Sequence, residues 1–153
     1  MSVIADLSLK IFQTEFDGDT GIMPRSHISG WLDANLGQLN TLLNTSYSGS
    51  NAELDLESQA IYKELYLASY YRKQSRNALR GLTEANGGGG DILSLRDGNS
   101  AVTFTNKNEV AKVYKSMADD SQMRLNQLVA KYNIYQAQPL QLGGIETNLD
   151  IYY

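Results

Sequence analysis

The sequence predicts a mainly α-helical bundle with one long central helix, a small hairpin-like extended pair and an extended C-terminal arm. Two observations lead to this prediction. Residues 52–80 contain neither Pro nor Gly, so nothing in the chain interrupts a helix there. Over residues 106–132, apolar side chains recur at three- and four-residue steps, which is the period of an amphipathic helix. We therefore expect a single helical domain over residues 1–133, followed by an arm over residues 134–153.

The first 25 residues are expected to form an extended N-terminal segment. Leu7, Leu9 and Ile11 alternate with polar residues, which is typical of a short strand or an extended arm, and a turn-rich stretch follows at residues 17–21. After Pro24 the spacing predicts a helix that begins near Ser26. Its apolar face comprises Ile28, Trp31, Leu32, Leu36, Leu39 and Leu43.

The long helix is predicted over residues 51–82. Ser50 followed by Glu53 resembles a capping box at its start, and Gly81 suits a left-handed cap at its end. The middle of this helix is apolar around most of its circumference, so it must be buried on several sides. A stripe of phenolic side chains runs through it, at Tyr62, Tyr66, Tyr70 and Tyr71. Two explanations stay open: a central core helix, or a stripe that neighbouring subunits bury.

The second half of the long helix carries a basic stripe, defined as Arg72, Arg76 and Arg80. These residues are four apart, so they share one helix face. Residues 60–80 hold five basic and one acidic side chain, whereas the whole chain has a net charge of −4. Bases at a helix C-terminus complement the helix dipole, and the same stripe would also suit an acidic partner or nucleic acid.

Residues 83–91 include four consecutive glycines, and no Gly-Lys-Ser/Thr follows them as in a phosphate-binding loop. We expect a hinge loop there, followed by an extended pair around residues 92–104. The next helix, over residues 106–132, would be capped by Asn106 with Glu109 three residues later. Its predicted inner face comprises Val110, Val113, Tyr114, Met117, Ser121, Leu125, Leu128, Val129 and Tyr132.

The predicted arm over residues 134–153 has no Lys or Arg, and its only acidic residues are Glu146 and Asp150. It is rich in aliphatic and aromatic side chains, unlike a disordered tail. We expect it to dock on another chain, with contacts from Ile145, Leu149, Ile151, Tyr152 and Tyr153.

Signatures of catalysis are weak throughout the sequence. The chain has no Cys, and His27, its single histidine, has no recognisable nucleophile motif beside it. Asp17 and Asp19 resemble the opening of a calcium loop, but Ile28 stands where such a loop needs a bidentate Glu. The expectation is a protein without enzyme activity, cofactor or metal, made in a cytoplasm. No apolar run is long enough to suggest a membrane span.

Residues 92–133 resemble a known family of virion proteins. The residues that carry this likeness are a Leu95-Arg96-Asp97-Gly98-Asn99-Ser100 turn, a helix start at residues 106–112, and Leu125, Leu128, Val129, Tyr132 and Asn133 near the helix end. They are similar to head-to-tail connector (adaptor) proteins of tailed bacteriophages, which form a ring below the portal. Residues 1–50 carry no part of the likeness.

The resemblance implies an α-helical protein that assembles into twelve-membered rings in the neck of a virion, with portal and tail proteins as neighbours. DNA would pass through such a ring without being bound specifically, which an acidic chain favours. Two alternatives stay open. One is a small binding module, such as a tail chaperone or a nucleic-acid accessory protein, that uses the basic stripe. The other is a tail-terminator or baseplate subunit.

Overall fold

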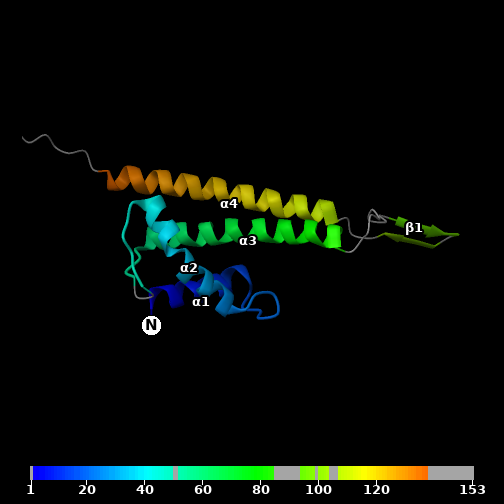
Figure 1. Ribbon diagram of the computed structural model, residues 1–153, viewed down its shortest axis with the longest axis horizontal. Helices are drawn as coiled ribbons and strands as arrows, with labels where there is room; N and C mark the ends of the chain where they lie inside the picture. Colours follow the sequence, from blue (N-terminus) through cyan, green and yellow to red (C-terminus); the bar gives the residue numbers. More distant parts are fainter. Residues whose placement is uncertain (1, 50–51, 85–93, 99, 104–106, 138–153) are drawn as a thin grey trace, which may run out of the picture.

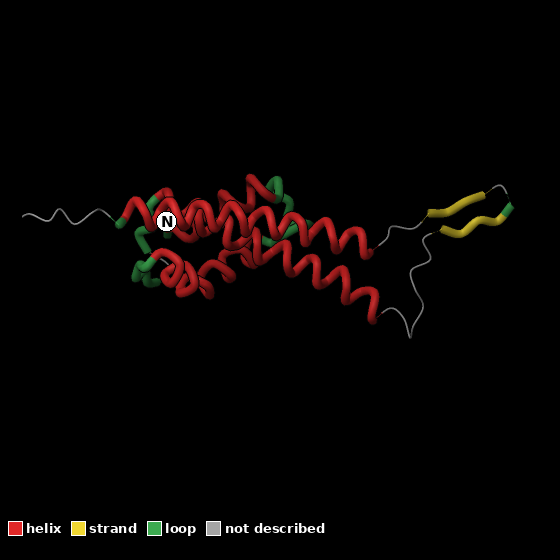
Figure 2. Tube along the Cα trace, turned by 90° about the horizontal axis from the view of Figure 1, so that it is seen from above, coloured by secondary structure: helices red, strands yellow, loops and turns green. Residues whose placement is uncertain are grey.

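The computed structural model describes residues 2–49, 52–84, 94–98, 100–103 and 107–137. Its elements are α1 (Val3–Glu15), α2 (Arg25–Leu43), α3 (Leu56–Glu84), β1 (Ser94–Asp97), β2 (Ser100–Thr103) and α4 (Lys107–Gln136). The mainly helical class predicted from the sequence is confirmed. α3 and α4 lie side by side along most of their length, and α1 and α2 cover one flank of α3 (Figures 1 and 2).

The expectation of an extended segment over residues 1–25 is wrong, because residues 3–15 form helix α1. Ser2 caps this helix by accepting a hydrogen bond from the backbone N–H of Ala5 at 3.2 Å. The buried positions are Ile4, Leu7, Ser8 and Ile11, which is helical spacing. The alternation at Leu7, Leu9 and Ile11 was misleading because it left out Ile4 and the small Ser8, which complete the buried stripe.

Helix α2 has the apolar face that its sequence predicts. Five of the six expected side chains are buried, and Trp31 is half-buried against the same core. Pro24, not Ser26, occupies the cap position. Arg25 joins α2 to α1, since its guanidinium donates to the backbone carbonyl of Ala5 at 2.9 Å.

The link from α2 to α3 is organised by Asn40. Its side chain donates to the carbonyl of Tyr47 at 2.8 Å and accepts from the N–H of Tyr47 at 2.9 Å and the hydroxyl of Thr45 at 3.0 Å.

The predicted start of α3 at residue 51 is wrong. Asp55 caps the helix instead, accepting from the N–H of Ser58 at 2.7 Å, while Ala52 before it is buried outside the helix. At the other end, α3 continues past Gly81 to Glu84.

Beyond α3, β1 and β2 pair antiparallel with Ser94 opposite Thr103 and Asp97 opposite Ser100. The strands lie past the ends of α3 and α4 (Figure 1). The predicted hinge loop over residues 83–91 is wrong at its start, because residues 83 and 84 belong to α3. Residues 85–91 and the predicted cap at Asn106 lie outside the described residues. α4 runs to Gln136, so the first three residues of the expected arm are helical.

The inner face of α4 differs in part from the prediction. Ala111, Ala118, Ser121, Leu125 and Tyr132 are buried, but Val113 and Met117 are 58% and 38% exposed. The buried stripe passes through small residues because α3 and α4 approach closely, and the distance between packed helices depends on side-chain size at the contact. Ser75 on α3 hydrogen-bonds the backbone carbonyl of Ala111 at 3.0 Å. Val113 and Met117 therefore face away from α3, although they are apolar.

Candidate functional site

Two of the four tyrosines proposed as a subunit interface belong to the core. Tyr62 and Tyr66 are 0% and 4% exposed, and the residues that cover them come from the same chain. The Tyr62 hydroxyl donates to the backbone carbonyl of Leu32 on α2. The ring of Trp31 lies 6.1 Å from that of Tyr62 and 5.3 Å from that of Tyr66. The interface prediction is wrong for these two residues because α1 and α2 cover this side of α3.

Burial changes the acidity of these two phenols. Removal from water raises the pKa of Tyr62 and that of Tyr66 well above the ordinary tyrosine value, because the phenolate is poorly solvated in the core. The negative charge of Asp33 adds to the effect at Tyr62, and Tyr70 adds to it at Tyr66. Both phenols are thus held neutral, which suits a structural role.

Tyr70 and Tyr71 are half-buried. Tyr70 packs edge-on against Phe16, with ring centroids 5.1 Å apart. Tyr71 stacks on Tyr114 of α4 at 6.5 Å. These two rings continue the aromatic contacts of the core outward, and each retains surface that a ligand or a partner can reach.

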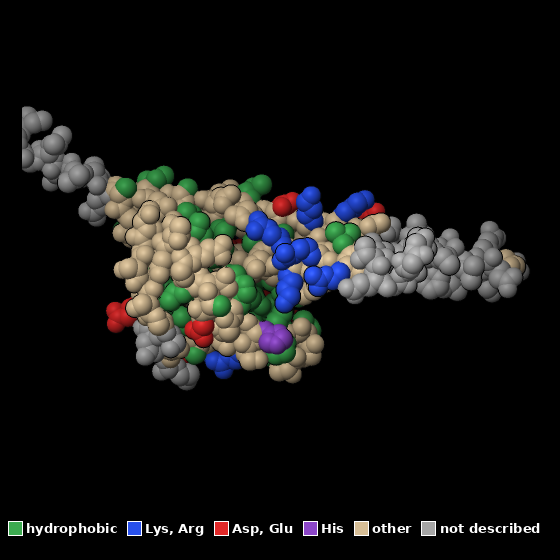
Figure 3. Space-filling view, in the orientation of Figure 1, with side chains coloured by type: hydrophobic (Ala, Val, Ile, Leu, Met, Phe, Trp, Pro, Cys, Tyr) green, Lys and Arg blue, Asp and Glu red, His purple; other side chains and the backbone are tan. Residues whose placement is uncertain are grey.

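The basic stripe lies beside α4. Arg72 donates to the side chain of Gln122 on α4 at 2.6 Å, and both Arg76 and Arg80 are exposed. Figure 3 shows Lys and Arg side chains gathered on one face over α3 and α4. Lys115 on α4 shares a groove of about 500 Å³ with Arg72 and Arg76, and Asp119 is the only carboxylate among its described lining residues. We call this the α3–α4 groove.

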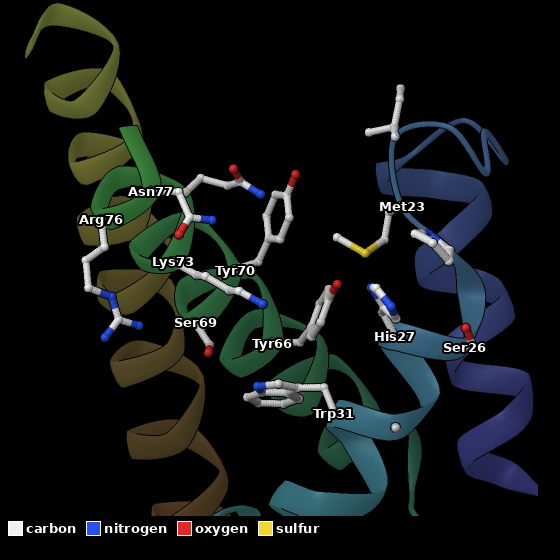
Figure 4. Close-up of a pocket in the computed structure, with 14 residues that line it drawn as sticks. Met23, Ser26, His27, Trp31, Tyr66, Ser69, Tyr70, Lys73, Arg76 and Asn77 are labelled. Atoms are coloured by element: carbon white, nitrogen blue, oxygen red, sulfur yellow. The ribbon is translucent and has the colours of Figure 1, made fainter. Parts of the chain in front are cut away.

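A larger hollow, the α2–α3 cavity, lies between the first turns of α2 and the middle of α3. Its volume is about 830 Å³. Figure 4 shows Met23, His27 and Trp31 on one side, with Tyr66, Tyr70 and Lys73 facing them from α3. None of its described lining residues is Asp or Glu. Arg76 and Ser69 line both this cavity and the α3–α4 groove, so the two hollows adjoin.

A third surface is apolar. Five of the eight large hydrophobic side chains that are exposed among the described residues lie on α4, namely Val113, Met117, Met123, Ile134 and Tyr135. Tyr135 also closes a groove of about 660 Å³ between the start of α3 and the end of α4, which we call the end groove. Leu56, Ile61, Leu128 and Tyr132 contribute apolar surface to it.

Sequence reasoning missed several of these residues. Val113 and Met117 were assigned to the core because periodicity marks them as apolar without showing which side of α4 meets α3. Trp31 and Lys73 were treated separately, and nothing local in the sequence brings them to one cavity. The predicted arm contacts Ile145, Leu149, Ile151, Tyr152 and Tyr153 lie outside the described residues.

Within the described part of the chain, no three His, Asp or Glu side chains come together as a metal site. Among the same residues, no helix combines the length and the apolar content needed to cross a membrane. No protein-family model, curated protein or solved structure matches the chain.

Proposed function

We propose that this chain is a structural subunit that assembles into a ring, and that the ring is the head-to-tail connector in the neck of a tailed phage. The observation that carries the proposal is the exposed apolar side of α4. Its core-facing side packs on α3, yet Val113, Met117 and Met123 are 58%, 38% and 61% exposed in the isolated chain. Full burial of a side chain of this kind contributes about 1.5–3 kcal/mol. These three are already partly buried, so a neighbouring subunit that covers them gains roughly half of that for each.

Ring closure needs two different surfaces that fit each other, because each subunit contacts the next one head to tail. The chain offers two separate apolar candidates. One is the exposed side of α4 near Val113 and Met117. The other is the end groove, where Leu56 is 75% and Tyr135 is 80% exposed. In the proposed ring, the exposed side of α4 in one subunit packs on a different surface of the next subunit. The end groove of each subunit remains available to receive an apolar segment.

The likeness to phage connectors supports the choice of particle. The residues that carry it fall on β1, the turn at Gly98, the start of β2 and both ends of α4. A tail-terminator or baseplate subunit would use the same apolar surfaces with different neighbours. Binding assays against purified portal and tail proteins distinguish these roles, since a connector binds the portal.

The assembly is tested by placing charge on α4. The double variant Val113→Lys/Met117→Lys should keep the helical circular dichroism spectrum, because both side chains are exposed, and should sediment as a smaller species. The matched control is Gln13→Lys on α1, which adds charge at an exposed position of another helix and should leave assembly intact. If the double variant and native protein sediment alike, the α4 side is not the interface.

A further inference from the structure

The α2–α3 cavity and the α3–α4 groove together have a composition that the ring proposal does not require. The cavity combines the rings of Trp31 and Tyr70 with the ammonium group of Lys73, and none of its described lining residues is a carboxylate. The adjoining groove adds Arg72 and Lys115, with Arg76 shared between the two hollows. Aromatic faces thus lie at one end of a short row of basic side chains. We call this row the basic track, and it comprises Lys73, Arg76, Arg72 and Lys115.

We infer that this track binds single-stranded nucleic acid without sequence preference. Proteins that do so pair a positively charged groove, which follows the phosphates, with aromatic side chains on which bases stack. Here a base would enter the cavity beside Trp31 and Tyr70, while Lys73 and Arg76 hold the adjacent phosphates. The next phosphates would lie along Arg72 and Lys115 in the α3–α4 groove.

The size and position of the hollows favour a single strand over a duplex. The cavity volume of about 830 Å³ lies within the range of sites that enclose small organic ligands, so it has room for an unstacked base. A duplex keeps its base faces stacked inside and offers none to an aromatic cavity. The polymer is favoured over a free nucleotide because the basic side chains continue past the cavity into a second hollow.

The alternative occupant is an acidic, aromatic protein segment, of which this chain has one. Residues 138–153 carry Glu146 and Asp150, two tyrosines, and no Lys or Arg. Two carboxylates spaced along such a segment match a track of four basic side chains less well than a phosphate at every nucleotide does. The nucleic acid is therefore the proposed ligand, and the peptide is a competitor in the test.

The test uses the full-length protein and a labelled oligothymidylate. Trp31 is the only tryptophan in the chain and it lines the cavity, so its fluorescence reports occupancy directly. Binding should quench this emission in parallel with the rise in anisotropy of the label. A strand that contacts four basic side chains should show log affinity falling with log salt at a slope of roughly −3, since each neutralised phosphate contributes about −0.7.

Lys73→Ala and Arg76→Ala should each reduce the slope by about 0.7 and weaken binding roughly fivefold at about 0.1 M salt. Both side chains are exposed, so the fold should survive, which circular dichroism checks. The matched control is Lys10→Ala, an exposed lysine on α1 away from both hollows, which should bind as the native protein does.

Three results would overturn the inference: no binding of the oligonucleotide, equal losses in Lys10→Ala and Lys73→Ala, or binding without a change in Trp31 emission. A synthetic peptide of residues 138–153 that quenches Trp31 when the oligonucleotide does not would assign the cavity to a protein segment instead. Sedimentation of the same samples reports assembly separately, so failure of this inference is distinguishable from failure of the ring proposal.

Discussion

Replacement of Tyr62 separates the two roles that its sequence position allowed, core residue and subunit contact. The side chain is fully buried within its own chain, and its hydroxyl donates to the Leu32 carbonyl. Tyr62→Ala removes a ring that buries about 150–250 Å², and aromatic-to-Ala changes in cores cost about 3–5 kcal/mol. Tyr62→Phe keeps the ring and loses one hydrogen bond, at a cost of about 1 kcal/mol.

For a chain of this length, 1 kcal/mol shifts Tm by roughly 2–4 °C, so Tyr62→Ala should lower Tm by about 6–20 °C and Tyr62→Phe by about 2–4 °C. Thermal unfolding followed by circular dichroism measures both values, and sedimentation measures the oligomeric state. A Tyr62→Ala protein with native Tm and impaired assembly would refute the assignment of this residue to the core.

Three further predictions concern the same fold. Burial raises the pKa of Tyr62 and Tyr66, so their contribution to stability is complete below pH ~10 and is lost above it, at about 1.4 kcal/mol per pH unit for each phenol. Urea titrations at several alkaline pH values should show this fall in the free energy of unfolding. In Tyr62→Phe the fall should be smaller by the part that Tyr62 contributes. Asp55→Ala should destabilise the protein by about 1 kcal/mol through loss of the α3 cap, whereas Asp55→Asn, which can still cap, should restore most of it in the same titration. Asn40→Ala removes three hydrogen bonds to the α2–α3 link and should lower the free energy of unfolding by about 2–3 kcal/mol. The control Asn35→Ala loses one hydrogen bond within α2 and should lower it by less. Equal losses in the two variants would contradict the role given to Asn40.

For α2, α3 and α4 the sequence was sufficient to predict a helix from apolar side chains at helical spacing, but for α1 it was not. The face of α2 follows from Ile28, Leu32 and Leu36 alone, because the large apolar side chains of that helix meet the same core. The helical class follows for the same reason. These features depend on local periodicity, which a single sequence contains.

The errors arose where the outcome depends on which other element covers a helix. Tyr62 and Tyr66 are candidates for a subunit interface in the sequence because α3 is apolar around most of its circumference, whereas in the fold α2 supplies Trp31 and Leu32 to cover them. On α4, periodicity grouped Val113 with Leu125, but close approach to α3 selects the side lined by Ala111 and Ala118. The α2–α3 cavity joins Trp31 to Lys73 across the fold, so its chemistry appears only after the helices have packed.

Electron microscopy of the purified protein tests the central claim, that the exposed apolar side of α4 is covered by another copy of the chain. We expect closed rings in which Val113 and Met117 lie at the contact between neighbouring subunits. Isolated 16.9 kDa monomers at every concentration, or rings that leave this side of α4 in solvent, would contradict it.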